Sequence, residues 1–232
     1  MRFIANFKTN HTRETTTKYI EDLNNELKNI DCSNILIFPP STALQKGKEK
    51  IEVGVQNAYP ILNGAYTGEI GVEQLKEFDI NQILIGHSER REILKESQEF
   101  ITQKFNFFME QNFEIIYCIG EPLEVREKGE DALFEYLFSQ FKGIDTNYSK
   151  LTVAYEPIWA IGTGVSATKQ DIELVHNRLK EKFDLPLLYG GSVKVDSISE
   201  IASIDSVDGV LVGSASLDAK GFSNLIKKGL GA

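Results

Sequence analysis

The sequence predicts an α/β protein in which residues 1–232 form a single domain, an eight-stranded parallel (β/α)8 barrel. Three observations predict it: eight short apolar segments recur along the chain, helical periodicity fills most of the intervals, and no proline- or serine-rich linker divides the sequence. Segments that are apolar at consecutive positions are typical of parallel strands covered on both faces. The length of 232 residues is slightly below the ~250 typical of such barrels. An open doubly wound sheet shares this local periodicity, but the strand count favours the barrel.

The expected strands and helices alternate in chain order. The apolar segments are residues 2–6, 34–39, 52–57, 82–87, 114–120, 151–156, 185–190 and 209–213. Three of the intervals place apolar residues on one helical face: Ile20, Leu23, Leu27 and Ile30; then Phe100, Ile101, Phe105, Phe108 and Met109; then Ile172, Val175 and Leu179. Spacings of three and four residues are those of a helix that packs one face on a sheet.

Composition limits the possible functions. The formal net charge of −9 argues against a nucleic-acid binder, which needs a basic face to neutralise phosphates. No run approaches the ~18 apolar residues of a membrane span, and the first residues lack a signal-peptide core. Cys32 and Cys118 belong to no C-x-x-C pair, so we expect neither a disulfide framework nor a zinc site. These features predict a cytoplasmic protein that needs no membrane and no metal.

Polar residues gather after several of the expected strands. They are Asn6 and Lys8 after the first segment, His87 at the fourth, Glu156 at the sixth, Gly190-Gly191-Ser192 at the seventh and Gly213-Ser214 at the eighth. A single strand-end His or Glu is more often a helix cap or a surface group than a catalyst. Five strand ends with complementary chemistry, however, fit the carboxyl-end face where barrel active sites are built.

His87 stands at an expected helix start, in the sequence GHSERRE with Ser88 as the expected cap. The positive end of a helix dipole disfavours a protonated imidazole. A neutral imidazole can still donate a hydrogen bond to a carbonyl oxygen, so His87 is a candidate electrophile.

The glycine-rich turns indicate a phosphate site rather than a dinucleotide site. GTGVSA (162–167) matches a dinucleotide fingerprint, but five residues separate it from Glu156 at the strand end, and no acid ends the next strand. Small-residue turns at Gly162, at 190–192 and at 213–214 could instead direct backbone N–H groups at one phosphate. The last two follow the seventh and eighth strands, the usual phosphate site of such barrels.

With these residues assembled, the chain resembles the triosephosphate isomerase family over nearly its whole length. The matching segments, in family order, are ANFKTN, QN…GAYTGE (56–69), GHSERRE, CIGE (118–121), AYEPIWAIGTG, YGGSV (189–193) and LVGSASL (211–217). The resemblance implies a TIM barrel. It also implies a cofactor-free aldose–ketose isomerase of glycolysis and gluconeogenesis that interconverts dihydroxyacetone phosphate and D-glyceraldehyde 3-phosphate through an enediol(ate).

The resemblance also implies roles for individual residues. Glu156 matches the catalytic base, His87 the neutral electrophile, and Lys8 the cation that stabilises the enediolate and the phosphate. Asn6 matches a substrate-contacting amide, and Glu89 a carboxylate that supports the lysine. The phosphate-binding positions match Gly162, Ser192, Gly213 and Ser214.

Two loops complete what the resemblance implies. Residues 157–164 match a lid that closes over bound substrate and excludes water. Residues 57–69 match a loop that inserts beside the partner's active site in a homodimer. A self-packed surface loop is the alternative for this segment, but exposed Ile61, Leu62 and Tyr66 would form an apolar patch of the kind that marks an interface.

One departure from the family pattern bears on the phosphate-binding part of the site. Ser214 replaces the second glycine of the usual G-G-A-S-L, and it would be strained if that position required a positive φ.

The residues also allow two other functions to be compared with the isomerase. A lyase or aldolase would use Lys8 as a Schiff base and would need no strand-end base such as Glu156. A non-catalytic phosphate binder would have no use for Lys8, His87 and Glu156 together.

Overall fold

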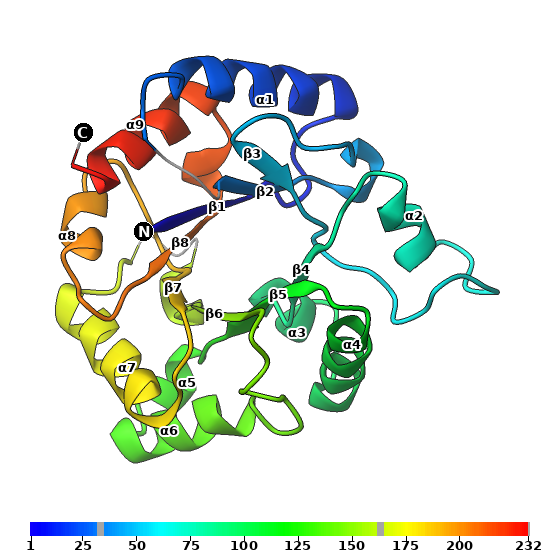
Figure 1. Ribbon diagram of the computed structural model, residues 1–232. Coiled ribbons are helices and arrows are strands. Elements are labelled where there is room, and N and C mark those ends of the chain that lie inside the picture. Colours follow the sequence, from blue (N-terminus) through cyan, green and yellow to red (C-terminus); the bar gives the residue numbers. More distant parts are fainter. Residues whose placement is uncertain (32–34, 162–164, 232) are drawn as a thin grey trace.

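The computed structural model describes residues 1–31, 35–161 and 165–231. Within these ranges eight parallel strands form one sheet in the order β3-β2-β1-β8-β7-β6-β5-β4. Its two edges meet through a parallel bridge between Val55 and Ile83. There, the Val55 N–H donates to Gln82 O at 2.9 Å, and the Leu84 N–H donates to Val55 O at 3.0 Å. The strands form a closed ring with the helices outside it (Figure 1), so the predicted barrel, rather than the open sheet, is confirmed.

The elements alternate along the chain as predicted. The strands are β1 (Arg2–Asn6), β2 (Ile35–Phe38), β3 (Ile51–Val53), β4 (Gln82–Ile85), β5 (Glu114–Ile119), β6 (Leu151–Tyr155), β7 (Leu187–Tyr189) and β8 (Gly209–Val212). The α-helices are α1 (Arg13–Glu26), α2 (Val72–Lys76), α3 (Ser88–Glu92), α4 (Gln98–Glu110), α5 (Leu123–Arg126), α6 (Glu130–Ser139), α7 (Lys169–Lys182), α8 (Ile198–Ala202) and α9 (Ala219–Gly229). Short 3₁₀ turns are η1 (Ser41–Ala43), η2 (Ile158–Ala160) and η3 (Ser214–Ser216).

The third strand differs most from its predicted range of 52–57. It ends at Val53 because the chain changes neighbours there: the Gly54 N–H still bonds Ile37 of β2, whereas Val55 already bonds β4. A side chain at Gly54 would lie 2.3 Å from the ring of Phe38. The glycine therefore lets the chain pass from one neighbouring strand to the other at the point where the barrel closes.

Four of the longer helices in the described ranges begin at side-chain caps, and the helices predicted from the sequence bury apolar faces. Thr12, Ser97, Thr168 and Asp218 accept backbone N–H groups in the first turns of α1, α4, α7 and α9. Predicted face residues such as Leu23, Phe105 and Leu179 are fully buried. None of the helices in the described ranges combines the length and apolar character needed to cross a bilayer.

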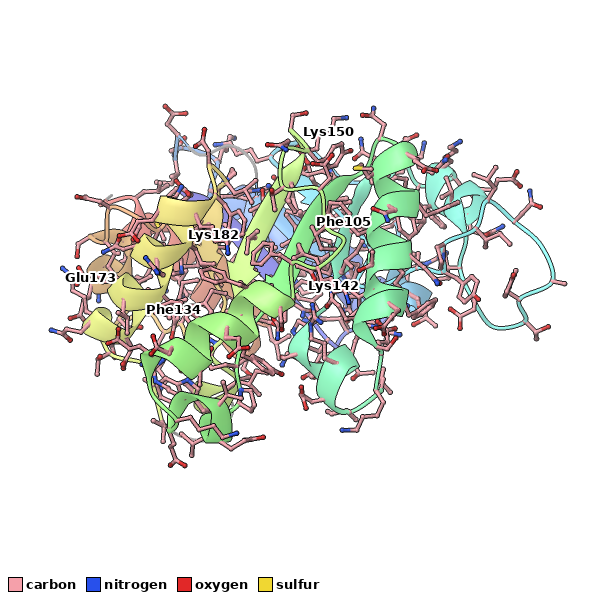
Figure 2. The ribbon with its side chains drawn as sticks, turned by 90° about the horizontal axis from the view of Figure 1, so that it is seen from below. Phe105, Phe134, Lys142, Lys150, Glu173 and Lys182 are labelled. Atoms are coloured by element: carbon pink, nitrogen blue, oxygen red, sulfur yellow. The ribbon has the colours of Figure 1, made fainter. Side chains whose placement is uncertain are left out.

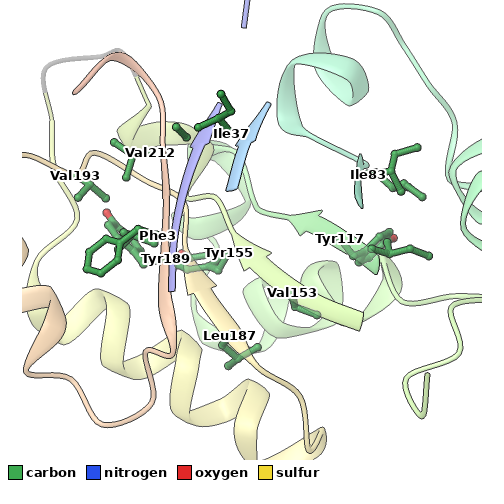
Figure 3. Packing of buried hydrophobic residues seen from close by; sticks show 14 of the residues in the cluster. Phe3, Ile37, Ile83, Tyr117, Val153, Tyr155, Leu187, Tyr189, Val193 and Val212 are labelled. Carbon is green, nitrogen blue, oxygen red and sulfur yellow. The ribbon is translucent and has the colours of Figure 1, made fainter. Parts of the chain in front are cut away.

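Alternate strand residues serve two separate apolar layers, as the two-residue period of a strand requires. One set fills the barrel interior: Ile4, Leu36, Phe38, Leu84, Ile116, Cys118, Ala154, Leu188 and Leu211. The other set, which includes Tyr155 and Tyr189, points outward and packs against the helices (Figure 3). Phe105 of α4 and Phe134 of α6 belong to this outer layer (Figure 2). Because the strands are parallel and the interior is filled, polar groups that follow the strands collect at one end of the barrel.

Candidate active site

A cavity of about 490 Å³ opens at the carboxyl ends of the strands. Its walls are Asn6, Lys8, His87, Glu156, Ala160, Ile161, Val165, Ser166, Gly190, Gly191, Ser192, Val193, Lys194, Leu211, Gly213, Ser214 and Ala215. Every catalytic and substrate-binding candidate of the sequence analysis that the structure describes is among them, whereas the supporting carboxylate Glu89 is not. Gly162, the remaining candidate, lies outside the described residues. Side chains more than 200 positions apart in the sequence thus surround one space.

Glu156 follows β6 directly and is only 2% exposed. Its Oε2 accepts the backbone N–H of Ser88 at 2.9 Å, and its Oε1 lies 3.0 Å from Nε2 of His87. A Cβ at Gly120, after β5, would lie 1.8 Å from the carbonyl oxygen of Glu156. Only glycine allows the two strand ends to approach this closely, so Gly120 helps to set the position of Glu156.

His87 is itself the N-cap of α3. Its Nδ1 accepts the backbone N–H of Glu89 at 3.2 Å. A ring nitrogen that accepts a hydrogen bond carries no proton, so the imidazole is neutral and its proton is on Nε2, which faces Glu156. The expected cap at Ser88 was one residue too late, because the imidazole takes the place of the hydroxyl. The neutral form predicted from the helix start therefore has a direct cause in the hydrogen bonding.

Lys8 is held in the left-handed region with φ 52°, a conformation that costs a non-glycine residue about 1 kcal/mol. Its backbone N–H donates to Asn6 Oδ1 at 3.0 Å, and its carbonyl accepts from Gln56 Nε2 at 2.7 Å. The ammonium lies 2.7 Å from Glu89 Oε1, where the resemblance implies a supporting carboxylate. Contacts from three segments thus direct the ammonium into the cavity and offset the backbone strain.

The expected phosphate end of the cavity lies on the turns after β7 and β8. Ser192, Gly213 and Ser214 line it, and η3 begins at Ser214. Gly213 has a φ of −88°, and Ser214 is not among the described residues with positive φ. The serine that replaces the usual glycine is therefore unstrained, and its backbone N–H is retained.

The two sides of the expected lid are anchored by one polar network. Glu121 is fully buried and accepts from Trp159 Nε1 at 2.8 Å, Tyr155 Oη at 3.0 Å and Arg126 Nη1 at 3.3 Å. Burial raises the pKa of the Glu121 carboxyl, although these donors oppose the shift. Arg126 also pairs with Asp171, which forms the capping box of α7 after the lid. The network therefore joins the segments on either side of residues 162–164, which lie outside the described ranges.

A metal centre would need several ligating side chains close together. Over the described ranges, no three His, Cys, Asp or Glu side chains form a group that could hold a metal ion.

Comparison with known proteins gives one result throughout. The family model for triosephosphate isomerase matches residues 1–229. The chain belongs to the triosephosphate isomerase family. The triosephosphate isomerase of a Sulfurovum species is 58% identical over 227 residues, which are 97% of this chain and 99% of that protein. The triosephosphate isomerase of Wolinella succinogenes is 51% identical over 231 residues, covering 98% of this chain and 100% of its own. That of Sulfurimonas denitrificans is 50% identical over 226 residues, covering 97% and 94%.

As a member of the triosephosphate isomerase family, the protein is an aldose–ketose isomerase. Sequence reasoning missed several residues that shape its cavity. Gly120 and Glu121 stood in CIGE, a segment that indicated the family but suggested no contact of its own. Lys194 follows YGGSV directly and lines the cavity. Lys194 could have been found from the sequence, because it is a basic residue beside a turn that was already expected to bind phosphate.

Proposed function

We propose that this member of the triosephosphate isomerase family interconverts dihydroxyacetone phosphate and D-glyceraldehyde 3-phosphate without a cofactor, with Glu156 as the base and His87 as the electrophile. One observation carries the assignment: a buried carboxylate and a neutral imidazole lie 3.0 Å apart on the wall of one cavity. A 1,2-proton shift requires a base that can reach two adjacent carbons of the substrate and an acid that can reach the two oxygens bonded to them. This acid–base tuning is well known for the family.

The contacts suggest how substrate binding starts the reaction. In the free site the Nε2 proton of His87 faces Glu156 Oε1. A substrate carbonyl oxygen that takes this proton as its hydrogen-bond donor releases Oε1. The carboxylate then removes a proton from the carbon beside the carbonyl. The proton returns to the neighbouring carbon, while His87 moves a proton between the two oxygens of the enediolate.

Lys8 and Asn6 bind the substrate at the reacting end. The Lys8 ammonium stabilises negative charge that develops on the enediolate oxygen, a role that grows stronger when water is excluded. Asn6 fixes the lysine through its Oδ1 and has its own amide N–H group for the substrate. Backbone N–H groups at Gly162, Ser192, Gly213 and Ser214 bind the phosphate in this assignment, and residues 157–164 close over it.

The test is turnover of D-glyceraldehyde 3-phosphate by purified protein in the presence of a chelator. Fast conversion to dihydroxyacetone phosphate supports the proposal, whereas no conversion by folded protein contradicts it. Borohydride added with substrate distinguishes the aldolase alternative, because a Schiff base at Lys8 would be trapped as a stable adduct.

Shortening the lid should lower turnover and increase loss of phosphate from the enediolate; unchanged product purity would contradict the role of the lid.

We also propose a homodimer formed through residues 57–69. This segment projects from the body of the molecule between β3 and α2 (Figure 1), and residues 62–69 are all exposed. Leu62 and Tyr66 are each 45% exposed, whereas Ile61, expected to be exposed, is partly buried. The segment is shaped from within: the Tyr59 and Tyr66 rings lie 4.4 Å apart, and the Val72 N–H donates to Ile61 O at 3.0 Å. A preformed projecting arm with an apolar tip suits insertion into a second copy.

Replacing residues 61–66 by glycine and serine tests the dimer. Sedimentation equilibrium should then report monomers, and turnover should be poor because the partner's arm would no longer lie beside the active site. A fully active monomer would contradict the coupling.

We further propose that the enzyme acts in the cytoplasm, because its proposed substrates belong to glycolysis and gluconeogenesis. In this proposal residues 1–232 form a single domain, and neither nucleic acid nor a membrane is a partner.

A further inference from the structure

The charges around the reacting centre do not by themselves favour an anion. Glu156 is a carboxylate, His87 is neutral, and the Lys8 ammonium lies 2.7 Å from the Glu89 carboxylate. One positive charge therefore faces two negative charges, in a chain whose formal net charge is −9. Capture of a doubly negative phosphoryl group calls for more positive potential at the mouth of the cavity.

Lys194 lies where that potential is needed. It follows Ser192 by two residues and lines the same cavity. It also lines a smaller space of about 80 Å³ together with Ser192 and with Ser166 and Ala167, which follow the lid. Lys194 therefore stands between the expected phosphate turn and the segment after the lid.

The backbone of Lys194 is fixed while its side chain is exposed. Its N–H donates to Ser197 Oγ at 3.1 Å, and its carbonyl accepts from the N–H groups of Ser197 at 3.1 Å and Ile198 at 3.0 Å. These bonds tie the base of the side chain to the start of α8. Within the described ranges no carboxylate forms an ion pair with the Lys194 ammonium, in contrast to Lys8. Its charge is therefore available to a ligand in the cavity.

We propose that Lys194 is a specificity-determining residue that attracts the phosphoryl dianion of the substrate to the cavity. The inference rests on the proposed function, which supplies that phosphoryl group. A charge at the rim of a site acts mainly on capture of the ligand and on its salt dependence. Lys194 should therefore contribute to kcat/KM and little to kcat.

The experiment compares Lys194→Gln with Lys194→Arg, which keeps the charge, and with a matched control, Lys150→Gln. Lys150 lies just before β6, at the opposite end of the strands from the cavity, and its Nζ donates to Asn112 O at 3.1 Å (Figure 2). Steady-state kinetics with D-glyceraldehyde 3-phosphate are measured at low and high salt, with inorganic phosphate as a competitive inhibitor. At low salt, Lys194→Gln should lower kcat/KM and weaken inhibition by phosphate, each about fivefold, and salt should reduce both effects.

The outcomes separate an electrostatic role from a structural one. Near-wild-type kinetics in Lys194→Arg and in Lys150→Gln support the proposal, as does an unchanged rate in Lys194→Gln with phosphate-free glyceraldehyde. Equal kinetics in Lys194→Gln and Lys150→Gln, or an equal loss with the phosphate-free substrate, would overturn it. If the wild type turns nothing over, the proposed function fails separately. Calorimetric titration of inorganic phosphate then decides: weaker binding by Lys194→Gln supports the role of Lys194, and equal binding refutes it.

Discussion

Two buried carboxylates lie just after the neighbouring strands β5 and β6: Glu121 in the polar network with Trp159 and Arg126, and Glu156 in the cavity wall. Both are at most 2% exposed. Glu121 Oε1 accepts from three packed side chains, Tyr155, Trp159 and Arg126. Glu156 has one backbone donor and the imidazole of His87, and beyond them an open cavity.

With Glu156 as the proposed base, the difference implies that burial alone does not make a carboxylate reactive. A buried charge whose donors come from packed side chains is held as part of the structure. A buried charge with few partners can exchange them for a ligand. The first arrangement resists movement, and the second permits it, which suits the proposed role of Glu156 as a base beneath a lid.

Glu156→Asp tests this difference with the largest expected effect. The shorter side chain withdraws the carboxylate by about 1 Å, and kcat should fall about 100-fold or more, because misplacement of this size disrupts proton transfer. The free energy of unfolding should hardly change. Glu121→Asp is the matched control: it should lower stability more than turnover, and the reverse pattern would contradict the comparison.

Acid should lower the free energy of unfolding through protonation of the buried His176. Its buried ring lies edge-on to Tyr155 with centroids 5.9 Å apart, and burial lowers the pKa of His176 from 6.5 to about 4. Above pH 6.5 the ring is neutral in both states. As the pH falls toward 4, the unfolded chain binds a proton that the folded chain does not, so stability should fall by about 3 kcal/mol from this group. Urea titrations across this range should show a shallower loss in His176→Phe than in the wild type; parallel curves would refute the assignment.

Glu121→Gln should affect stability next most strongly. The neutral amide cannot form the ion pair with Arg126, so we expect a loss of about 1–3 kcal/mol in unfolding free energy and a less than tenfold loss in kcat. The raised pKa of Glu121 fixes the sign of the pH dependence. Its contribution is fully present below the unfolded pKa of about 4.3 and declines as the pH rises through the folded value. The wild type should therefore exceed the variant most in acid, and a gap that widens toward neutral pH would contradict this.

Trp159→Phe should give the smallest effect. It removes one hydrogen bond to Glu121 and keeps most of the apolar ring, so about 1 kcal/mol of stability should be lost. Because Trp159 belongs to η2 in the proposed lid, turnover should change a few-fold while the pH profile of kcat stays in place. Measured beside Trp159→Phe, Tyr155→Phe removes a second donor to the same carboxylate from the rigid strand. It should cost similar stability with less change in turnover.

The barrel and most of the cavity could be predicted from the sequence because both depend on local patterns. Apolar runs mark the strands, and polar residues that follow parallel strands must meet at one end. His87, Glu156 and Ser192 were found in this way. The neutral state of His87 was also predictable, since it follows from the helix start.

The remaining features depend on contacts between distant segments. The need for glycine at Gly120 appears only when β5 and β6 lie side by side, because the clash is with Glu156. The anchoring of Trp159 by Glu121 joins residues 38 positions apart with no shared motif. The strain considered for Ser214 could not be judged without its backbone angles, and the structure shows none.

The junction of β3 and β4 is where we expect the barrel to open first. Elsewhere around the ring a strand pairs with its neighbour over at least two residues, and β5 pairs with β6 over five. The junction itself is bridged through Val55 and Ile83. Amide hydrogens of Val55 and Leu84 should therefore exchange with solvent through a small local opening, long before those in the middle of β5. The projecting arm leaves the barrel just beyond this point, so a second subunit that grips the arm would also hold the ring shut.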